Sequence, residues 1–415
     1  MAAVSAVHRP RPHGWVRHYA GFLSPGAAAA MPVVLERDRL QRLRRLTATV
    51  GDSTRQRARR TRPRMRALIA APGGRLLWRD VPAPPPPGPD GAIVHPIASS
   101  TCDLDCPLAL GATQLALPLH LGHECVAEVL AVGERVGTVK VGDRVVVPFQ
   151  INCGACGPCR AGRTGNCASV PPISMYGMGV GAGHWGGAFS DQLAVPYADA
   201  MLVALPEGID PIAAASVADN VCDAYRHIAP HLPPLLQADP DAEILILGAT
   251  DPKTLFTASL PLYTGLIARA YGARNIAFAD ARPSVRAHAE RLGLDTLHPR
   301  ALRRRRRPAP LVVDTNANEG LALANTAPDG ICSSSGGLHR SGSIPLLKMY
   351  VRNATLHVGR THARALMPQV LDLMVDGRLR PQDIPMNVAP LDDAPSALRE
   401  HFYSGEGVKT VLRTA

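Results

Sequence analysis

Four cysteines lie close together in one segment that is rich in glycine and proline. They are Cys153, Cys156, Cys159 and Cys167, separated by two, two and seven residues. Zinc takes four tetrahedral ligands, and a set of four thiolates is a common structural arrangement. This spacing therefore predicts a structural zinc site, with a disulfide pair or an iron–sulfur site as the alternatives. Four protein ligands leave no open position, so we expect this site to be unreactive.

A second group of metal-ligand types precedes this segment. Cys102 is followed by Asp105, then by the run Gly122-His123-Glu124, and Gly142-Asp143-Arg144-Val145 leads into the four cysteines. In this order, the motifs resemble those of the zinc-containing medium-chain alcohol dehydrogenases. The resemblance covers about residues 65–415. The combination is much more specific than any single motif.

The resemblance implies a second, catalytic zinc. Cys102 and His123 match two of its ligands, and Glu124 matches a carboxylate in or next to the coordination shell. Asp219 matches the third ligand of members that resemble glutathione-independent formaldehyde dehydrogenases, and Cys222 is its rival. Three protein ligands would leave a fourth position open for substrate, as catalysis requires.

The same resemblance implies an NAD(P)-dependent oxidoreductase that transfers hydride between a small alcohol, or an aldehyde hydrate, and the cofactor. NAD is the expected cofactor and NADP the alternative. The family often carries a hydroxyl residue two positions after the first cysteine and a histidine five after it, which relay the substrate proton. Here these positions are Leu104 and Pro107, so the usual relay is absent. The family also implies a homo-oligomer, either a dimer or a tetramer.

The hydrophobic patterns predict an α/β chain with two kinds of sheet. Short strands separated by Gly- and Asp-containing turns, over 65–196, are typical of an antiparallel barrel. After residue 211 strands and helices alternate, which favours a doubly wound parallel sheet. The expected strands and helices of this sheet are 243–248, 259–272, 275–279, 283–292 and 311–314.

With the resemblance, these patterns predict two domains. A GroES-like catalytic domain is expected over 65–212 and 346–415, with the structural-zinc lobe at 150–168. A Rossmann nucleotide-binding domain is expected over 213–345.

The nucleotide-binding turn departs from the usual pattern. The strand at 243–247 ends at Gly248, and no G-x-G-x-x-G follows it, so the turn to the next helix is lengthened. Asp280 matches the acid that binds the adenosine ribose, or else caps the next helix, and Arg282 keeps NADP as an alternative. Thr315, Gly336 and Arg360 are further expected cofactor contacts, from strand ends and the returning segment.

The charge of the chain is concentrated at its beginning. Residues 1–64 hold 14 arginines, no lysine and three acidic residues, whereas the rest holds 31 basic and 31 acidic residues. The body of the protein therefore gives no electrostatic reason to bind nucleic acid. We interpret 1–64 as disordered: an upstream read-through before Met65, a targeting peptide, or a basic arm.

The apolar runs and the cysteines bear on where the protein is found in the cell. No apolar run reaches the length of a membrane span. Most of the nine cysteines have metal-like spacing, which argues against an oxidised, secreted protein and predicts the cytoplasm. Five consecutive arginines, 303–307, are expected in a solvated loop rather than a phosphate site.

Two other functions compete with the enzyme. A zinc-binding scaffold that is catalytically weak or inactive would explain the altered glycine turn and the missing relay. A nucleic-acid-binding protein would have to use the Arg-rich extension as its arm.

Overall fold

The structure is a computed structural model that describes residues 63–113, 115–179, 185–336, 344–404 and 408–414. Apart from Pro63 and Arg64, the Arg-rich extension lies outside the described residues, so its expected disorder stays a prediction. Arg64 is the first residue of strand β1 (Arg64–Ala71).

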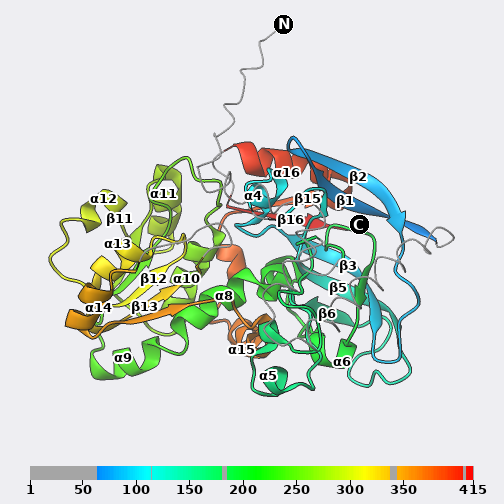
Figure 1. Cartoon of the computed structure of the whole chain (residues 1–415), viewed down its shortest axis with the longest axis horizontal. Helices are drawn as coiled ribbons and strands as arrows, with labels where there is room; N and C mark the ends of the chain where they lie inside the picture. The colour runs from blue at the N-terminus through cyan, green and yellow to red at the C-terminus, as the bar shows by residue number, and fades with distance from the viewer. Residues whose placement is uncertain (1–62, 114, 180–184, 337–343, 405–407, 415) are drawn as a thin grey trace, which may run out of the picture.

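The molecule has two units that lie side by side (Figure 1). One unit contains a six-stranded parallel sheet with its helices, and the other contains the two remaining sheets. The predicted α/β class, with a barrel-like unit and a doubly wound unit, is confirmed.

The parallel sheet has the strand order β11-β10-β9-β12-β13-β14, which is the doubly wound order 3-2-1-4-5-6. All five neighbouring pairs are parallel. Its strands are β9 (Ile244–Leu247), β10 (Ile276–Ala279), β11 (Asp295–Leu297), β12 (Ala309–Asp314), β13 (Thr326–Ser334) and β14 (Thr355–Val358). The sheet therefore continues to Val358, past the expected domain boundary at 345.

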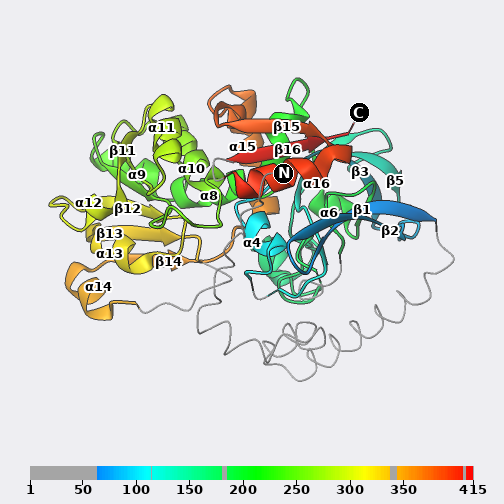
Figure 2. The same cartoon turned by 90° about the horizontal axis from the view of Figure 1, so that it is seen from above.

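Helices cover both faces of this sheet (Figure 2). In β9, Ile244 and Ile246 share a core with one set of helices, whereas Leu245 and Leu247 pack with α13 on the opposite face. An apolar strand between two helical layers is what a continuous Ile-Leu-Ile-Leu run predicts. The helices of this unit are α9 (Leu232–Ala238), α10 (Ser259–Ala270), α11 (Pro283–Arg291), α12 (Pro299–Leu302), α13 (Glu319–Ala324) and α14 (Leu346–Arg352).

The second unit is built on a seven-stranded sheet with the order β15-β16-β3-β5-β6-β8, in which β7 also pairs with β3. All of its pairs are antiparallel except β15 with β16. Its strands are β3 (Ala92–Ser100), β5 (Glu124–Val132), β6 (Arg144–Val147), β7 (Leu193–Val195), β8 (Val203–Ala204), β15 (Met386–Pro390) and β16 (Lys409–Arg413).

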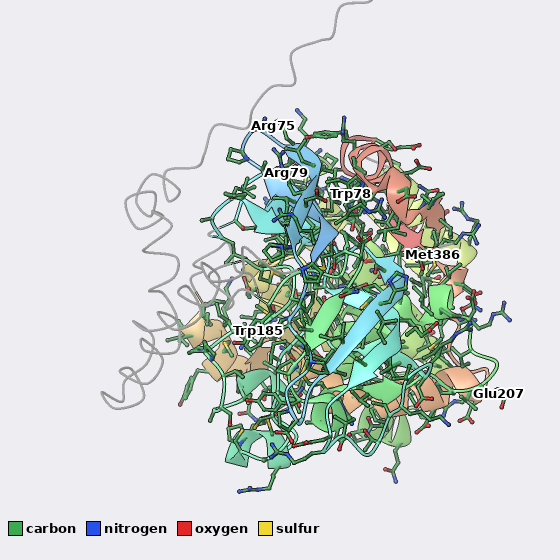
Figure 3. The ribbon with its side chains drawn as sticks, turned by 90° about the vertical axis from the view of Figure 1, so that its right-hand side faces the viewer. Arg75, Trp78, Arg79, Trp185, Glu207 and Met386 are labelled. Carbon is green, nitrogen blue, oxygen red and sulfur yellow. The ribbon has the colours of Figure 1, made fainter. Side chains whose placement is uncertain are left out.

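A separate three-stranded sheet, with the order β2-β1-β4, also belongs to this unit. Strand β1 pairs with β2 (Arg75–Pro82) and with β4 (Leu119–His120). Trp78 lies on this hairpin, in β2 (Figure 3). Its indole nitrogen donates to the carbonyl of Asp392 at 3.3 Å, which connects the hairpin to the carboxyl-terminal segment.

The remaining helices belong to the second unit or lie between the units. They are α4 (Asp105–Ala109), α5 (Gly157–Arg160), α6 (Ala198–Met201), α7 (Pro211–Ala214), α8 (Asn220–Ile228), α15 (Ala363–Val375) and α16 (Ala394–Tyr403). Helices α8 and α15 lie at the junction of the two units (Figure 1). Residues of both helices share one apolar core with β9 and α10, which holds the units together.

Candidate active site and zinc lobe

Strand pairing brings Cys102 and His123 together. Strands β3 and β5 are antiparallel, and Ser100 at the end of β3 lies opposite Glu124 at the start of β5. Cys102 follows Ser100 by two residues and His123 precedes Glu124 by one, so both side chains lie at the same end of the sheet. Asp219 reaches this point from the segment that precedes α8.

The four predicted residues Cys102, His123, Glu124 and Asp219 form one buried cluster. One potential ligand atom from each lies within 4.8 Å of all the others. The His123 Nε2 atom is 3.4 Å from a carboxylate oxygen of Asp219. The rival Cys222 is buried elsewhere, with its thiol 3.7 Å from the carbonyl of Ala363. The geometry therefore favours Asp219 over Cys222 as the third ligand.

A divalent metal ion fits this cluster. Among the described residues, neither ring nitrogen of His123 has a hydrogen-bond partner, although the side chain is buried. Burial raises the pKa of Cys102 well above its ordinary value, and the carboxylates of Asp219 and Glu124 raise it further. A cation at the centre would stabilise the thiolate and the carboxylates and would use the free imidazole nitrogen.

Asp105 supports His123 from the other side. Its Oδ1 atom is 3.5 Å from His123 Nδ1, and both side chains are buried. Burial alone would lower the pKa of His123, but the charges of Asp105 and Asp219 raise it to about 9. A carboxylate behind a metal-binding imidazole fixes the ring orientation and the tautomer.

Glu124 is already engaged by a buried lysine. Lys409 of β16 lies 3.0 Å from one carboxylate oxygen of Glu124 and 2.8 Å from the amide oxygen of Asn220. The backbone N–H of Asn220 donates to the other oxygen of Glu124 at 3.2 Å. Burial would lower the pKa of Lys409, but the charge of Glu124 raises it. Glu124 thus lies beside the cluster and is held in an ion pair.

Lys409 and Asp105 are residues that the sequence reasoning missed as parts of the site. A single lysine inside the apolar run Val408–Leu412 was a usable signal, because a lysine in a buried strand needs a partner. No spacing rule, however, links residue 409 to residue 124.

The four cysteines of the lobe also come together. One sulfur from each lies within 4.8 Å of the others, and all four thiols are free. The sulfurs of Cys156 and Cys167 are 3.9 Å apart, close to the ~3.8 Å edge of a tetrahedron with ~2.3 Å zinc–sulfur bonds. Burial would raise the pKa of Cys156, but backbone N–H groups of Ala168 and Cys159 lower it to about 6. The donor set fits zinc and does not match a disulfide pair.

A small, mostly apolar cavity of about 150 Å³ opens beside Cys102, His123 and Asp219. Its apolar wall includes Leu104, Phe149, Met175, Met178, Phe256 and Leu260. Three of the expected cofactor contacts, Thr315, Gly336 and Arg360, line the same cavity. A space of this size next to a metal-type cluster suits a small organic molecule.

The other two expected cofactor residues, Gly248 and Asp280, lie away from this cavity and touch each other. A Cβ atom on Gly248 would lie 2.5 Å from an Asp280 carboxylate oxygen. Asp280 is fully buried, and its oxygens accept from the guanidinium and backbone of Arg282 and from the backbone N–H of Ala249. These four bonds use all the acceptor sites of the carboxylate. Ribose binding by Asp280 stays a prediction that requires Arg282 to move.

The turn that should hold a pyrophosphate is long and is already filled. Ten residues separate Gly248 from the first turn of α10, in agreement with the predicted lengthening. The first N–H groups of α10 donate to the carboxylate of Asp103. Asp103 thus occupies the expected pyrophosphate position and Arg282 occupies the carboxylate expected to bind the ribose. In this arrangement the site does not fit a dinucleotide.

A barrel-like unit, a doubly wound unit and two zinc-type donor sets together are typical of zinc-dependent dehydrogenases. Residues 88–207 match the family model for the alcohol dehydrogenase GroES-like domain. A Mycobacterium tuberculosis protein named "probable zinc-binding alcohol dehydrogenase" is 29% identical over 364 residues, which are 84% of this chain and 88% of that protein. A glutathione-independent formaldehyde dehydrogenase of Pseudomonas aeruginosa is 29% identical over 280 residues, 65% of this chain and 64% of that enzyme.

A solved structure is similar as well. An alcohol dehydrogenase from Thermus sp. ATN1 superimposes with a TM-score of 0.75 at 28% identity, covering 85% of this chain and all of that one. The domain match, the relatives and this structure are all consistent with the zinc-containing medium-chain alcohol dehydrogenase family. Within the described ranges, no helix has the length and apolar character needed to cross a membrane.

Proposed function

We propose that this protein is a zinc-dependent oxidoreductase that interconverts a small alcohol, or an aldehyde hydrate, and its oxidised product with NAD(P). The observation that carries this proposal is the convergence of Cys102, His123 and Asp219 around an unpartnered imidazole nitrogen, at the end of a small apolar cavity. The names of the relatives, which are alcohol and formaldehyde dehydrogenases, support the same reaction class.

The residues of the cluster have distinct proposed roles. Cys102, His123 and Asp219 would hold the catalytic zinc, which acts as a Lewis acid on an oxygen of the substrate. Asp105 orients the imidazole of His123. Glu124 lies next to the ligands, where its charge is offset by its ion pair with Lys409.

The cavity wall positions the substrate and excludes water. Leu104 lies where the family often has a hydroxyl group, so the side chain at this position cannot pass on a proton. Another polar group of the cavity would have to relay the substrate proton. Asn220 and Asp223 line the cavity and lie close in the chain to the proposed ligand Asp219. Burial raises the pKa of Asp223, so its carboxyl group holds a proton at higher pH than an exposed aspartate does.

The proposed division of the chain follows the two units except at 346–358, where α14 and β14 belong to the parallel-sheet unit. Residues 65–212 and 346–415 would carry the catalytic zinc and the structural zinc lobe at 150–168. Residues 213–345 would carry most of the dinucleotide contacts, including Thr315 and Gly336, and Arg360 of the returning segment would add another. All three border the cavity. Four thiolates at Cys153, Cys156, Cys159 and Cys167 would hold the structural zinc.

We also infer a cytoplasmic homo-oligomer, either a dimer or a tetramer. The free thiols support a reducing compartment. An apolar patch supports association: Leu346, Leu347, Tyr350 and Val351 of α14 are all at least 71% exposed. Strand β14, next to this helix, is the edge of the parallel sheet. Exposed apolar patches and open sheet edges are typical of subunit contacts.

A direct test is turnover by the zinc-loaded protein. Small alcohols and aldehydes would be supplied with NAD⁺, NADP⁺ or the reduced forms, and absorbance at 340 nm followed. Wild type should turn over at least one substrate, and Cys102→Ala should lose this activity while keeping its fold by circular dichroism. Absence of turnover with either cofactor would favour the weak or inactive scaffold, which the filled pyrophosphate position also supports.

A further inference from the structure

The carboxylate of Asp103 lies on the amino-terminal end of α10. The backbone N–H groups of Ser259 and Leu260 donate to its two oxygens, each at 3.0 Å. The hydroxyl of Thr257 donates at 2.7 Å, and the hydroxyl of Ser259 donates as well. Asp103 is only 8% exposed, so this carboxylate is almost completely enclosed by its donors.

These hydrogen bonds connect the two units of the molecule. Asp103 directly follows the proposed zinc ligand Cys102, whereas α10 belongs to the parallel-sheet unit. The Ser259 hydroxyl oxygen also lies 2.9 Å from the amide oxygen of Asn220. The amide nitrogen of Asn220 donates to the Cys102 sulfur at 3.4 Å. The end of α10 is thus fixed to the metal-type cluster.

Helix α10 lies at the position where doubly wound sheets usually bind a dinucleotide. The helix follows β9, and β9 and β12 are the neighbours at which the strand order reverses. In doubly wound sheets the dinucleotide lies at this reversal, with its pyrophosphate on the N–H groups that begin the first helix. Asp103 occupies those donors with a carboxylate.

The loop before α10 also differs from the usual glycine turn. The residues from Gly248 to Ala258 replace the short glycine turn, and Phe256 of this loop lines the cavity beside Cys102. The carbonyl of Phe256 accepts from Arg282, and Arg282 holds Asp280. This loop therefore contacts both Arg282, which holds Asp280, and the cavity beside Cys102.

We propose that Asp103 is an internal anion that occupies the pyrophosphate position, so that a dinucleotide binds only when this carboxylate leaves α10. This inference rests on the proposed function, because it presumes that a dinucleotide is the cofactor. Its consequence is a low affinity for NAD(P)H, set by competition between two anions for the same N–H groups. Because Asp103 is next to Cys102, cofactor binding and the zinc cluster are mechanically connected.

Removal of the charge should increase cofactor affinity. Asp103→Asn keeps the size of the side chain but loses the charge-assisted hydrogen bonds and the repulsion of a pyrophosphate. We expect the Kd for NADH to fall by at least about ten-fold, given the strength of hydrogen bonds to charged groups. A merely structural role would give the opposite result, because loosening the end of α10 would weaken binding.

The test is a fluorescence titration of the zinc-loaded full chain with NADH. Asp103→Asn would be compared with wild type and with Asp210→Asn, which alters a carboxylate that caps a different helix, α7. Asp210→Asn should bind NADH as wild type does. Inorganic pyrophosphate should compete with NADH more effectively in Asp103→Asn than in wild type.

A second, milder variant keeps the inference testable if Asp103→Asn does not fold. Thr257→Val removes one donor to Asp103 but keeps the charge, and it should increase NADH affinity by a smaller factor. Equal or weaker NADH binding by folded Asp103→Asn or Thr257→Val would overturn the inference while leaving the proposed function intact. Absence of NADH and NADPH binding in all variants would instead overturn the proposed function, and the inference with it.

Discussion

At the scale of single residues, the choice between Asp219 and Cys222 illustrates what the structure adds. The two residues are three positions apart, and the sequence left both open as the third ligand. The carboxylate of Asp219 points to His123, whereas the thiol of Cys222 points to the carbonyl of Ala363. Ligand identity therefore depends on the direction of the chain just before α8, which residue spacing does not determine.

Substitution of Asp219 should impair the metal site, and substitution of Cys222 should not. In Asp219→Ala we expect turnover and zinc affinity to fall at least as much as the ~10–100-fold loss typical of outer-sphere partners. In Cys222→Ala both should stay within about two-fold of wild type. The check is turnover at 340 nm together with zinc competition against a chelator. The assignment is wrong if the two variants exchange these phenotypes.

His401 should make the stability of the protein dependent on pH. Burial and, to a smaller extent, the charge of Lys409 lower its pKa from 6.5 to about 4, against an opposing contribution from the charge of Asp103. Between these two values the unfolded chain binds more protons than the folded one, so the free energy of unfolding decreases as the pH falls from 6.5 to 4. The full effect is about 3 kcal/mol.

Urea unfolding at several pH values measures this effect. His401→Gln should show a shallower decrease of the free energy of unfolding than wild type between pH 6.5 and 4. Identical slopes for His401→Gln and wild type would rule out the contribution of His401.

At the scale of elements, the turn into β5 places His123. Gly122 has a φ of +87°, and a Cβ atom there would lie 2.7 Å from the ring and backbone of Phe189. Only glycine satisfies both the backbone angle and this close approach. The turn therefore depends on Gly122 for two separate reasons.

Gly122→Ala should destabilise the protein more than Gly142→Ala. Gly142 has a similar φ of +90°, but a Cβ atom there would meet no other atom within 4 Å, so it carries the backbone cost alone, about 1 kcal/mol. The clash with Phe189 should add about 1–3 kcal/mol at Gly122. Urea unfolding of both variants measures the difference, and equal losses would show that the contact with Phe189 is unimportant.

The elements themselves could largely be predicted from the sequence. The expected strand at 243–248 and helix at 259–272 correspond to β9 and α10, because buried apolar runs and helical patterns are local signals. The contacts of Asp103 and Lys409 could not be predicted. They join residues more than 150 positions apart, and their partners are ordinary polar groups without a characteristic spacing.

At the scale of the whole molecule, the cluster depends on both units being in place. Cys102 follows the end of β3 and His123 precedes the start of β5, whereas Asp219 precedes α8 at the junction with the parallel-sheet unit. The sheet also ends in β14 beside the exposed apolar residues of α14, so the unit with most of the proposed cofactor contacts also carries the proposed subunit surface.

Association should depend on α14. Leu347→Glu places a charge on a residue that is 75% exposed, and it should convert the oligomer to monomers without changing the fold. Val141→Glu, at an exposed apolar residue of the other unit, serves as the control and should leave the oligomer intact. Sedimentation velocity distinguishes the two. A monomeric wild type, or an oligomeric Leu347→Glu, would contradict the proposed interface.

The most direct measurement of the two zinc sites is the number of zinc ions per chain, determined by elemental analysis of the purified protein. Wild type should hold two ions. Cys102→Ala should lose the ion between His123 and Asp219, and Cys159→Ser should lose the ion of the four-cysteine lobe, so that each variant holds one. Two ions in folded Cys102→Ala, or one ion in both Cys102→Ala and wild type, would contradict a catalytic zinc at this cluster.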